Sequence, residues 1–297
     1  MSLSGRMRRS LVPIAVAAVL SGAWLCALAS TGPVHRPVPG GVAWVDLAGI
    51  AELDSHVTFQ GARLLLLPHG MDGRRGVWAL LGIGLDIEPG DHHLEVWASP
   101  EAEAPTARVP VRVGPEDYPT QHIHIKERRK VHPEPKDMER IRGESAQMAA
   151  AFAHWRAAAP DVVDWKLPVL GPQSSAFGLR RVFNGVPRRP HSGIDWAAPA
   201  GTPVVAPTAG EVTLVGDFFF NGKTVIVDHG SGLISLYCHL QSVQVEPGML
   251  LGPGDRLGTV GATGRATGPH LHFSVNLNGV RVNPALFFAP SSEADLP

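Results

Sequence analysis

The sequence has 297 residues, enough for two domains that each bury a core of their own. Hydrophobic residues make up 44% and charged residues 18%, which indicates a globular chain and excludes a disordered one. The formal net charge of -1 gives no overall attraction to nucleic acid or anionic lipid, so nucleic acid is not expected as a partner.

The first 29 residues have the pattern of an export signal. Arg6, Arg8 and Arg9 precede an uncharged apolar stretch, and Ala27-Leu28-Ala29 is a small-residue cleavage site. We therefore predict a signal peptide over residues 1–29. A retained membrane anchor is the alternative, because the uncharged stretch approaches the length that spans a bilayer. Such an anchor is the sole membrane contact that the sequence predicts, and either reading places the rest of the chain outside the cytoplasm.

The chain has two cysteines, and Cys26 lies inside the apolar stretch. Cleavage would leave Cys238 alone, so no disulfide framework is expected and the hydrophobic cores must hold the protein together.

Residues 30–40 contain proline and glycine and are predicted to be a tether. Residues 41–115 contain short apolar runs separated by turns, a spacing typical of a small β-sandwich, and we expect an immunoglobulin-like one. Its predicted strands are Val42–Leu47, Arg63–Leu67, Val77–Ile83, His93–Trp97 and Arg108–Val113.

Residues 116–162 are predicted to be a connector with a helix. Polar and apolar residues alternate over Gln121–Ile125, which predicts a surface strand with His122 and His124 on one face. The proline-free stretch Lys136–Ala159 is rich in Met, Ala, Glu, Arg and Gln, and it predicts the main helix of the chain.

Residues 163–290 return to strands and turns, followed by a tail over 291–297. Asn221-Gly222 and Asn278-Gly279 are two-residue hairpin signals whose central positions favour positive φ. Together they predict a mostly antiparallel β domain, and hence a mainly β protein overall. The predicted strands are Gly210–Val215, Thr224–Asp228, Leu233–His239, Gln244–Val245, Leu257–Val260 and His270–Leu277.

Four histidines and one aspartate of this domain stand out. His191 and Asp195 lie four residues apart on a segment whose flanking prolines and glycine predict a loop entering a strand. His270 and His272 alternate on a strand and should project from one face, and His239 ends another apolar strand. Each piece alone is common, and a hydrogen-bonded structural histidine is the plain alternative. Their combination favours a metal site with acid–base residues beside it.

Residues 167–288 resemble the lysostaphin/LytM-type peptidases, family M23. Several motifs occur in the order of that family, and they cover most of this domain. The motifs are Ser175–Gly185, His191–Asp195, Ala198–Pro203, Val227–Gly232, Tyr237–Leu240 and Gly261–Phe273. The front half resembles, less specifically, the immunoglobulin-like segment that precedes the peptidase domain in some Gram-negative members.

The resemblance implies that His191, Asp195 and His272 hold one Zn2+ per chain. Two imidazoles and a carboxylate suit zinc and leave a fourth position open for water. It also implies that His239 and His270 are catalytic residues outside the ligand set. One would accept the proton of the water and the other would hydrogen-bond the developing oxyanion, and the sequence leaves open which does which.

Other residues have weaker signals. The resemblance implies that Arg180, Arg181 and Asn184 line the substrate groove, with a solvated loop as the alternative. His229 beside a turn is expected to be structural. Cys238 and His239 are adjacent on a predicted strand and should point to opposite faces, which excludes a thiol–imidazole pair.

The predicted function is zinc-dependent hydrolysis of peptide bonds in peptidoglycan stem peptides or cross-links. Resemblance to Gram-negative members favours the D-alanyl–diaminopimelate bond and a location in the periplasm or cell envelope. One alternative is a non-catalytic cell-wall-binding or amidase-regulating module, which has no need of all five residues. Another is an enzyme whose first domain covers the groove until an unidentified regulatory protein releases it.

Overall fold

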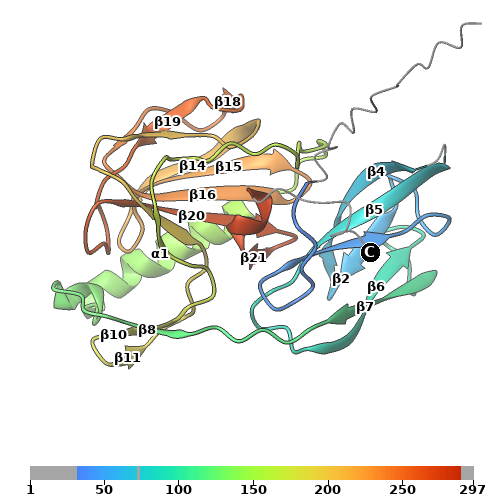
Figure 1. Ribbon diagram of the computed structural model, residues 1–297, viewed down its shortest axis with the longest axis horizontal. Coiled ribbons are helices and arrows are strands. Elements are labelled where there is room, and N and C mark those ends of the chain that lie inside the picture. Colours follow the sequence, from blue (N-terminus) through green and yellow to red (C-terminus); the bar gives the residue numbers. More distant parts are fainter. Residues whose placement is uncertain (1–31, 72–73, 289–297) are drawn as a thin grey trace, which may run out of the picture.

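The computed structural model describes residues 32–71 and 74–288. The predicted signal peptide (1–29) and the tail (291–297) lie outside these residues. The described chain forms two β domains, a sandwich at the right of Figure 1 and a larger sheet domain at the left. None of the helices in the described part is long and apolar enough to cross a membrane.

The N-terminal domain is a β-sandwich, as predicted. One sheet has the order β1-β5-β4 and the other the order β3-β2-β6-β7. Alternate residues of both sheets enclose a core that includes Leu47, Leu81 and Leu94. The strands are β1 (Val42–Asp46), β2 (His56–Phe59), β3 (Ala62–Arg63), β4 (Leu65–Met71), β5 (Arg74–Gly82), β6 (Gly90–Trp97) and β7 (Ala107–Val113). The strand β2 was not among those predicted.

The connector contains β8 (Thr120–Ile123), the short 3-10 helix η1 (Arg128–Lys130) and α1 (Pro135–Phe152). His122 in β8 and His124 directly after it are both exposed, as expected for a surface segment. The helix α1 begins with a capping box between Glu134 and Asp137.

The helix ends at Phe152 and not at the predicted Ala159. The residues that follow turn away to contact the sheet instead of continuing the helix. His154 Nδ1 lies 3.0 Å from Asp228 Oδ2, and Arg156 donates to the Asp228 carbonyl at 3.0 Å. The Ala158 carbonyl accepts a hydrogen bond from Ser231. Tertiary contacts therefore end the helix where sequence preference would have allowed it to continue.

The C-terminal domain is built on one large antiparallel sheet of order β18-β14-β15-β16-β20-β12-β9, with β21 paired to β20. A small sheet, β13-β19-β17, covers one end, and β8 adds to β10 and β11 in a third. The strands are β9 (Gln173–Ser175), β10 (Arg180–Phe183), β11 (Val186–Pro187), β12 (Ile194–Ala197), β13 (Pro203–Val205), β14 (Gly210–Phe218), β15 (Gly222–Gly230), β16 (Leu233–Leu240), β17 (Ser242–Val243), β18 (Leu250–Leu251), β19 (Arg256–Thr259), β20 (His270–Leu277) and β21 (Val280–Val282), followed by η2 (Pro284–Phe287). The predicted strand Gln244–Val245 is found two residues earlier, as β17.

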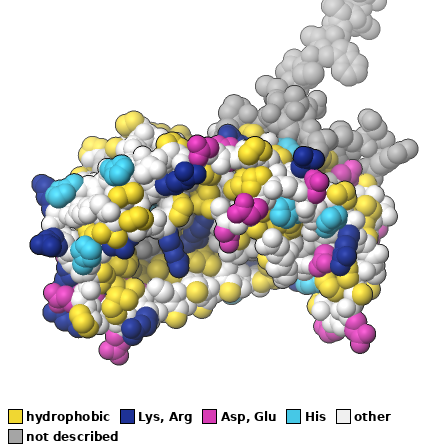
Figure 2. Space-filling view, turned by 90° about the horizontal axis from the view of Figure 1, so that it is seen from below, with side chains coloured by type: hydrophobic (Ala, Val, Ile, Leu, Met, Phe, Trp, Pro, Cys, Tyr) yellow, Lys and Arg dark blue, Asp and Glu magenta, His cyan; other side chains and the backbone are white. Residues whose placement is uncertain are grey.

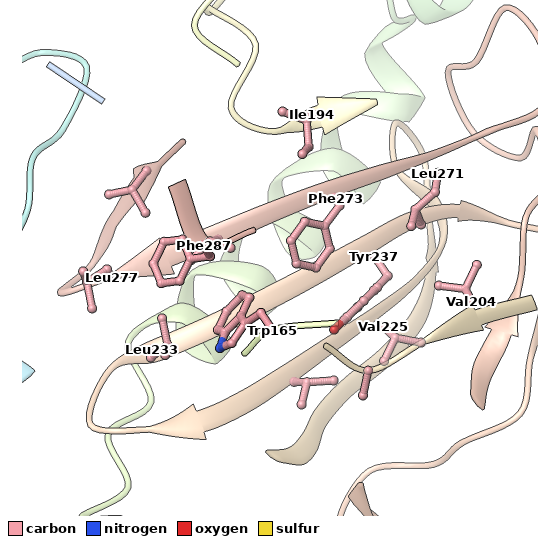
Figure 3. Close-up of a cluster of buried hydrophobic side chains, with 14 of the residues drawn as sticks. Trp165, Ile194, Val204, Val225, Leu233, Tyr237, Leu271, Phe273, Leu277 and Phe287 are labelled. Carbon is pink, nitrogen blue, oxygen red and sulfur yellow. The ribbon is translucent and has the colours of Figure 1, made fainter. Parts of the chain in front are cut away.

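The two faces of the large sheet have different neighbours. One face packs into the main core, where Trp165, Tyr237 and Phe273 point toward one another (Figure 3). On the other face, Leu236 and Cys238 pack against Met148 and Phe152 of α1. The helix covers only part of this second face, and the remainder carries the candidate site.

The two domains share a buried junction. Trp44 and Trp78 of the sandwich belong to the same hydrophobic cluster as Trp165 of the C-terminal domain. The Asn278 side chain accepts a hydrogen bond from the Gly82 N–H at 2.6 Å and donates to the Gly82 carbonyl at 3.0 Å. These are the two hydrogen bonds that a neighbouring strand would make with the end of β5. The Asn278 side chain therefore connects the two domains.

Candidate metal centre

Three of the predicted residues converge at one point. His191 lies on the loop before β12, Asp195 lies on β12, and His272 is the direct cross-strand partner of Asp195 on β20. His191 Nε2 is 3.0 Å from Asp195 Oδ1 and 3.0 Å from His272 Nδ1, and His272 Nδ1 is 2.8 Å from Asp195 Oδ1. His191 and Asp195 are buried, and His272 is nearly so.

The hydrogen-bonding roles of these atoms favour a cation between them. His191 Nδ1 lies 2.6 Å from the Ala176 carbonyl. Because a carbonyl only accepts, the Nδ1 nitrogen carries the hydrogen and the neutral ring presents a lone pair at Nε2. That lone pair faces a carboxylate oxygen, so two acceptors meet. Ligand atoms of a tetrahedral zinc site lie about 3.3 Å apart, close to the distances here. The donor set therefore fits zinc.

Further side chains hold these three in place. Arg181 donates to Asp195 Oδ2 at 2.8 Å, which turns the other carboxylate oxygen toward the two histidines. Ser175 Oγ lies 3.3 Å from His191 Nδ1, and Ser274 Oγ lies 3.0 Å from His272 Nε2. Such outer contacts orient metal ligands. The sequence analysis assigned no role to Ser175 or Ser274, because their contacts depend on strand pairing.

The environment keeps the ligand atoms in the forms that bind a metal. Burial opposes ionisation of Asp195, but the close approach of His191 and His272 outweighs it and lowers the pKa of the carboxyl group. Burial lowers the pKa of His272 to about 4, although Asp195 opposes this shift. The pair therefore offers a carboxylate and a neutral imidazole at neutral pH.

His239 and His270 lie beside this group. The ring centroids of His239 and His270 are 4.7 Å apart, and those of His239 and His272 are 6.1 Å apart. In each case Nδ1 lies 2.8 Å from a carbonyl of the loop 261–268, that of Thr263 for His239 and that of Gly268 for His270. Nε2 is therefore the ring nitrogen left to face a substrate.

A β-bulge brings His239 into the site. Along β15 and β16, Lys223 pairs with Leu240 and Val225 pairs with Tyr237, so Cys238 and His239 together oppose Thr224. His239 has φ 62°, in the left-handed region. This local reversal carries its ring toward His270 and His272. Burial, followed by the neighbouring histidines, lowers the pKa of His239 to about 3.

The bulge corrects one argument from sequence. Strict alternation was expected to place Cys238 and His239 on opposite faces, yet both line the same cavity. The thiol is excluded from chemistry for another reason. It accepts a hydrogen bond from Asn221 at 3.2 Å, and burial raises its pKa to about 12. Cys238 is thus a core residue.

The site lies in a cavity of about 960 Å³ between the sheet, the connector and α1. Apolar residues of α1 and of the connector, such as Met148 and Ile123, form one wall, and the loop 261–268 contributes to another. Figure 2 shows this side of the molecule from below, with dark blue basic side chains around and within a hollow on the left. A volume of this size is within the range of ligand-binding pockets.

Two residues expected to contact substrate lie elsewhere. Arg180 is exposed and pairs with Asp117 at 2.9 Å. Asn184 is an exposed turn residue with φ 51°, and its side chain hydrogen-bonds both the N–H and the carbonyl of Ile125. Neither lines the cavity, whereas Arg181 does.

His229 has a structural position, as expected. Its Nδ1 donates to the Ala209 carbonyl at 2.7 Å, and its Nε2 lies 2.7 Å from Ser235 Oγ. Both ring nitrogens are thereby satisfied inside the core, and burial lowers the pKa to about 4.

Comparison with family models covers both domains. Residues 189–284 match the model of Peptidase family M23, and residues 35–113 match that of the Peptidase family M23 N-terminal domain. The fold matches a crystal structure of a peptidase M23 from Pseudomonas aeruginosa with a TM-score of 0.69 and 42% identity. This match covers 86% of the present chain and 96% of the other.

Two curated relatives match a shorter stretch. The DD-carboxypeptidase/endopeptidase Mpg of Neisseria meningitidis is 42% identical over 120 residues, 40% of the present chain and 28% of the relative. The peptidoglycan DD-endopeptidase ShyC of Vibrio cholerae is 38% identical over 122 residues, 41% of the present chain and 28% of the relative. The chain thus spans less than a third of the length of either.

Proposed function

Since this chain belongs to peptidase family M23, we propose that it is a zinc-dependent endopeptidase that hydrolyses peptide bonds of peptidoglycan. One observation carries the proposal. Two imidazole nitrogens and a carboxylate oxygen converge in this cavity, with two further histidines beside them. A non-catalytic binding module needs no such group, so we set that alternative aside.

The assignment of roles follows from the contacts of each side chain. His191, Asp195 and His272 would hold one zinc ion, which supplies a Lewis acid and a water whose pKa is lowered to about 7. Arg181 fixes the carboxylate of Asp195 in its binding orientation. The Nε2 atoms of His239 and His270 are free to accept a proton from the attacking water and to hydrogen-bond the oxygen of the bond being cleaved.

The substrate is proposed from the relatives and the cavity together. Relatives named peptidoglycan DD-endopeptidases support a peptide bond of the stem peptides or their cross-links, and we favour the D-alanyl–diaminopimelate bond. Access to that substrate requires export, so we place the protein in the cell envelope or periplasm of a Gram-negative bacterium.

Cleavage of purified cross-linked muropeptides tests the proposal. The wild-type protein and His272→Ala would be assayed with and without a chelator, and zinc per chain would be measured in each. We expect cleavage of a cross-link bond that disappears with the chelator and with the substitution. Zinc bound to the wild-type protein without any cleavage would favour a binding module.

A further inference from the structure

The cavity beside the metal centre carries an excess of positive charge. Asp195 is the one acidic residue among those lining the cavity in the described chain. Five arginines line the same cavity, Arg181, Arg188, Arg189, Arg265 and Arg281. Three of them, Arg181, Arg188 and Arg265, are close enough to interact electrostatically, and we call them the arginine cluster.

The cluster is held by neutral groups more than by carboxylates. Arg181 has Asp195 as its acidic partner. Arg188 donates to the Val131 carbonyl. Arg265 lies over two aromatic rings, with its guanidinium carbon 4.8 Å from the ring centre of Phe183 and 4.4 Å from that of Phe220. Among the described residues, no acidic side chain pairs with Arg188 or Arg265.

Two observations indicate that the cluster lacks a partner. The Nε atoms of Arg181 and Arg188 are buried without a hydrogen-bond acceptor among the described residues. Burial lowers the pKa of Arg265 to about 10, and the charges of Arg181 and Arg188 add to that shift. Natural proteins seldom leave buried guanidinium donors unpaired, since each such group costs free energy.

We propose that the arginine cluster binds a free carboxylate of the peptide substrate, close to the bond that is cleaved. This inference rests on the proposed function and adds the class of substrate, a peptide with an unblocked carboxylate near the scissile bond. Guanidinium groups form paired hydrogen bonds with carboxylates and discriminate against the neutral amide. The cluster lies beside Asp195, so a carboxylate bound there would fix the peptide relative to the metal centre.

A matched pair of substrates tests the proposal on the wild-type protein. One is a cross-linked muropeptide whose carboxylates are free, and the other is the same compound with those carboxylates amidated. We expect KM to be about tenfold or more lower for the free acid, with similar kcat. Equal kinetics for the two compounds would overturn the proposal and leave the proposed function intact.

Substitutions in the arginine cluster test whether it causes the preference for the free acid over the amidated compound. Arg188→Gln and Arg265→Gln should each raise KM for the free acid about tenfold and abolish the preference over the amide. Arg142→Gln, on the exposed face of α1 and outside the cavity, serves as the matched control and should behave as wild type. A loss of kcat with unchanged KM for both compounds would overturn the binding role. Thermal melting identifies a variant that fails to fold, and the wild-type comparison then stands alone.

Failure of the proposed function is distinguishable from failure of this inference. If the zinc-loaded protein cleaves neither compound, the endopeptidase proposal fails. Calorimetric titration of the same two compounds then tests the cluster by itself. Binding of the free acid about tenfold more tightly supports the subsite, and equal affinity overturns it.

Discussion

At the residue scale, the four histidines of the site differ in the group that contacts the ring nitrogen pointing away from the proposed metal position. His239 and His270 bond to carbonyls of the loop 261–268, whereas the ligand histidines contact Ala176 and Ser274. The first pair is therefore positioned independently of the metal, by backbone that surrounds the site.

This division predicts different losses for different substitutions. His239→Gln and His270→Gln should each lower kcat about 100-fold or more, because a positioned proton acceptor or donor is removed. Both variants should keep one zinc per chain, unlike His272→Ala. Atomic absorption and single-substrate kinetics on the same preparations measure the two properties. Zinc loss in either glutamine variant would place that histidine in the ligand set.

His229 predicts a pH dependence of stability. Its pKa is about 4 in the folded protein and about 6.5 when unfolded, so the unfolded chain binds more protons between these values. The contribution of His229 is complete above about pH 6.5 and falls as the pH drops toward 4, by about 2 kcal/mol at pH 5. Denaturant unfolding of wild type and His229→Gln at two pH values isolates this contribution. A pH-independent difference between the two proteins would contradict the assignment.

Short sequence motifs pointed to the four histidines and the aspartate of the candidate site more clearly than to the residues around them. His191, Asp195, His270 and His272 occur in short motifs whose geometry is local to one loop and one strand. Arg180 and Arg181 could not be told apart in this way. The face that each occupies is set by pairing of β10 with β8, where Arg181 stands opposite Gln121. That pairing joins distant parts of the chain.

At the element scale, the hairpin between β14 and β15 supports the loop 261–268. Gly222 has φ 63°, and a Cβ there would lie 2.3 Å from Thr263 Oγ1 and 2.4 Å from its backbone. In the same hairpin, the Asn221 carbonyl accepts a hydrogen bond from the His239 N–H, and the Phe220 carbonyl accepts one from the Arg265 N–H. It therefore positions the bulge and the loop 261–268 together.

The substitution Gly222→Ala should disturb both the bulge at His239 and the loop 261–268. We expect a loss of about 2 kcal/mol or more in the free energy of unfolding from the clash and the positive φ, together with a lower kcat. Gly279→Ala is the matched control, since it also has positive φ, at 84°, but open space around it. That control should lose about 1 kcal/mol and keep its kcat. Equal kcat in the two variants would argue against a role of this hairpin in positioning the loop 261–268.

Strands were predicted well and irregular features were not. Apolar alternation located most strands within a few residues, and Asn278-Gly279 forms the predicted two-residue turn, with positive φ at both positions. The prediction of a two-residue turn at Asn221-Gly222 was wrong, because Gly222 already pairs with Phe218 and the loop between them has three residues, 219–221. The end of α1 and the bulge at His239 depend on contacts with remote segments. A local pattern carries no information about such contacts.

At the scale of the whole molecule, two asparagines join segments that are distant in sequence. Asn184 pairs with the backbone of Ile125 and ties the connector to the C-terminal domain, and Asn278 pairs with Gly82 and ties the sandwich to it. The cavity is lined by residues from Gln121 onward, so none of the sandwich residues that the structure describes contributes to its lining. This arrangement does not support the alternative in which the first domain covers the substrate groove of an autoinhibited enzyme.

Asn278→Ala tests the junction. The substitution leaves the buried N–H and carbonyl of Gly82 without partners, and we expect a loss of about 1–3 kcal/mol in the free energy of unfolding. Cleavage kinetics should stay close to wild type, because Asn278 does not line the cavity. Calorimetric melting and muropeptide cleavage measure the two effects. A rise in kcat on loosening the junction would revive the autoinhibited alternative.

The bulge at His239 also limits which sequences the site can tolerate. A left-handed backbone is readily adopted by glycine and asparagine, less so by aspartate and histidine, and hardly at all by β-branched residues. Within that short set, histidine is the one member that brings an imidazole nitrogen into the site. A saturation library at this position, sorted for folded protein, should return all four residues. Sorted for activity, it should return histidine alone.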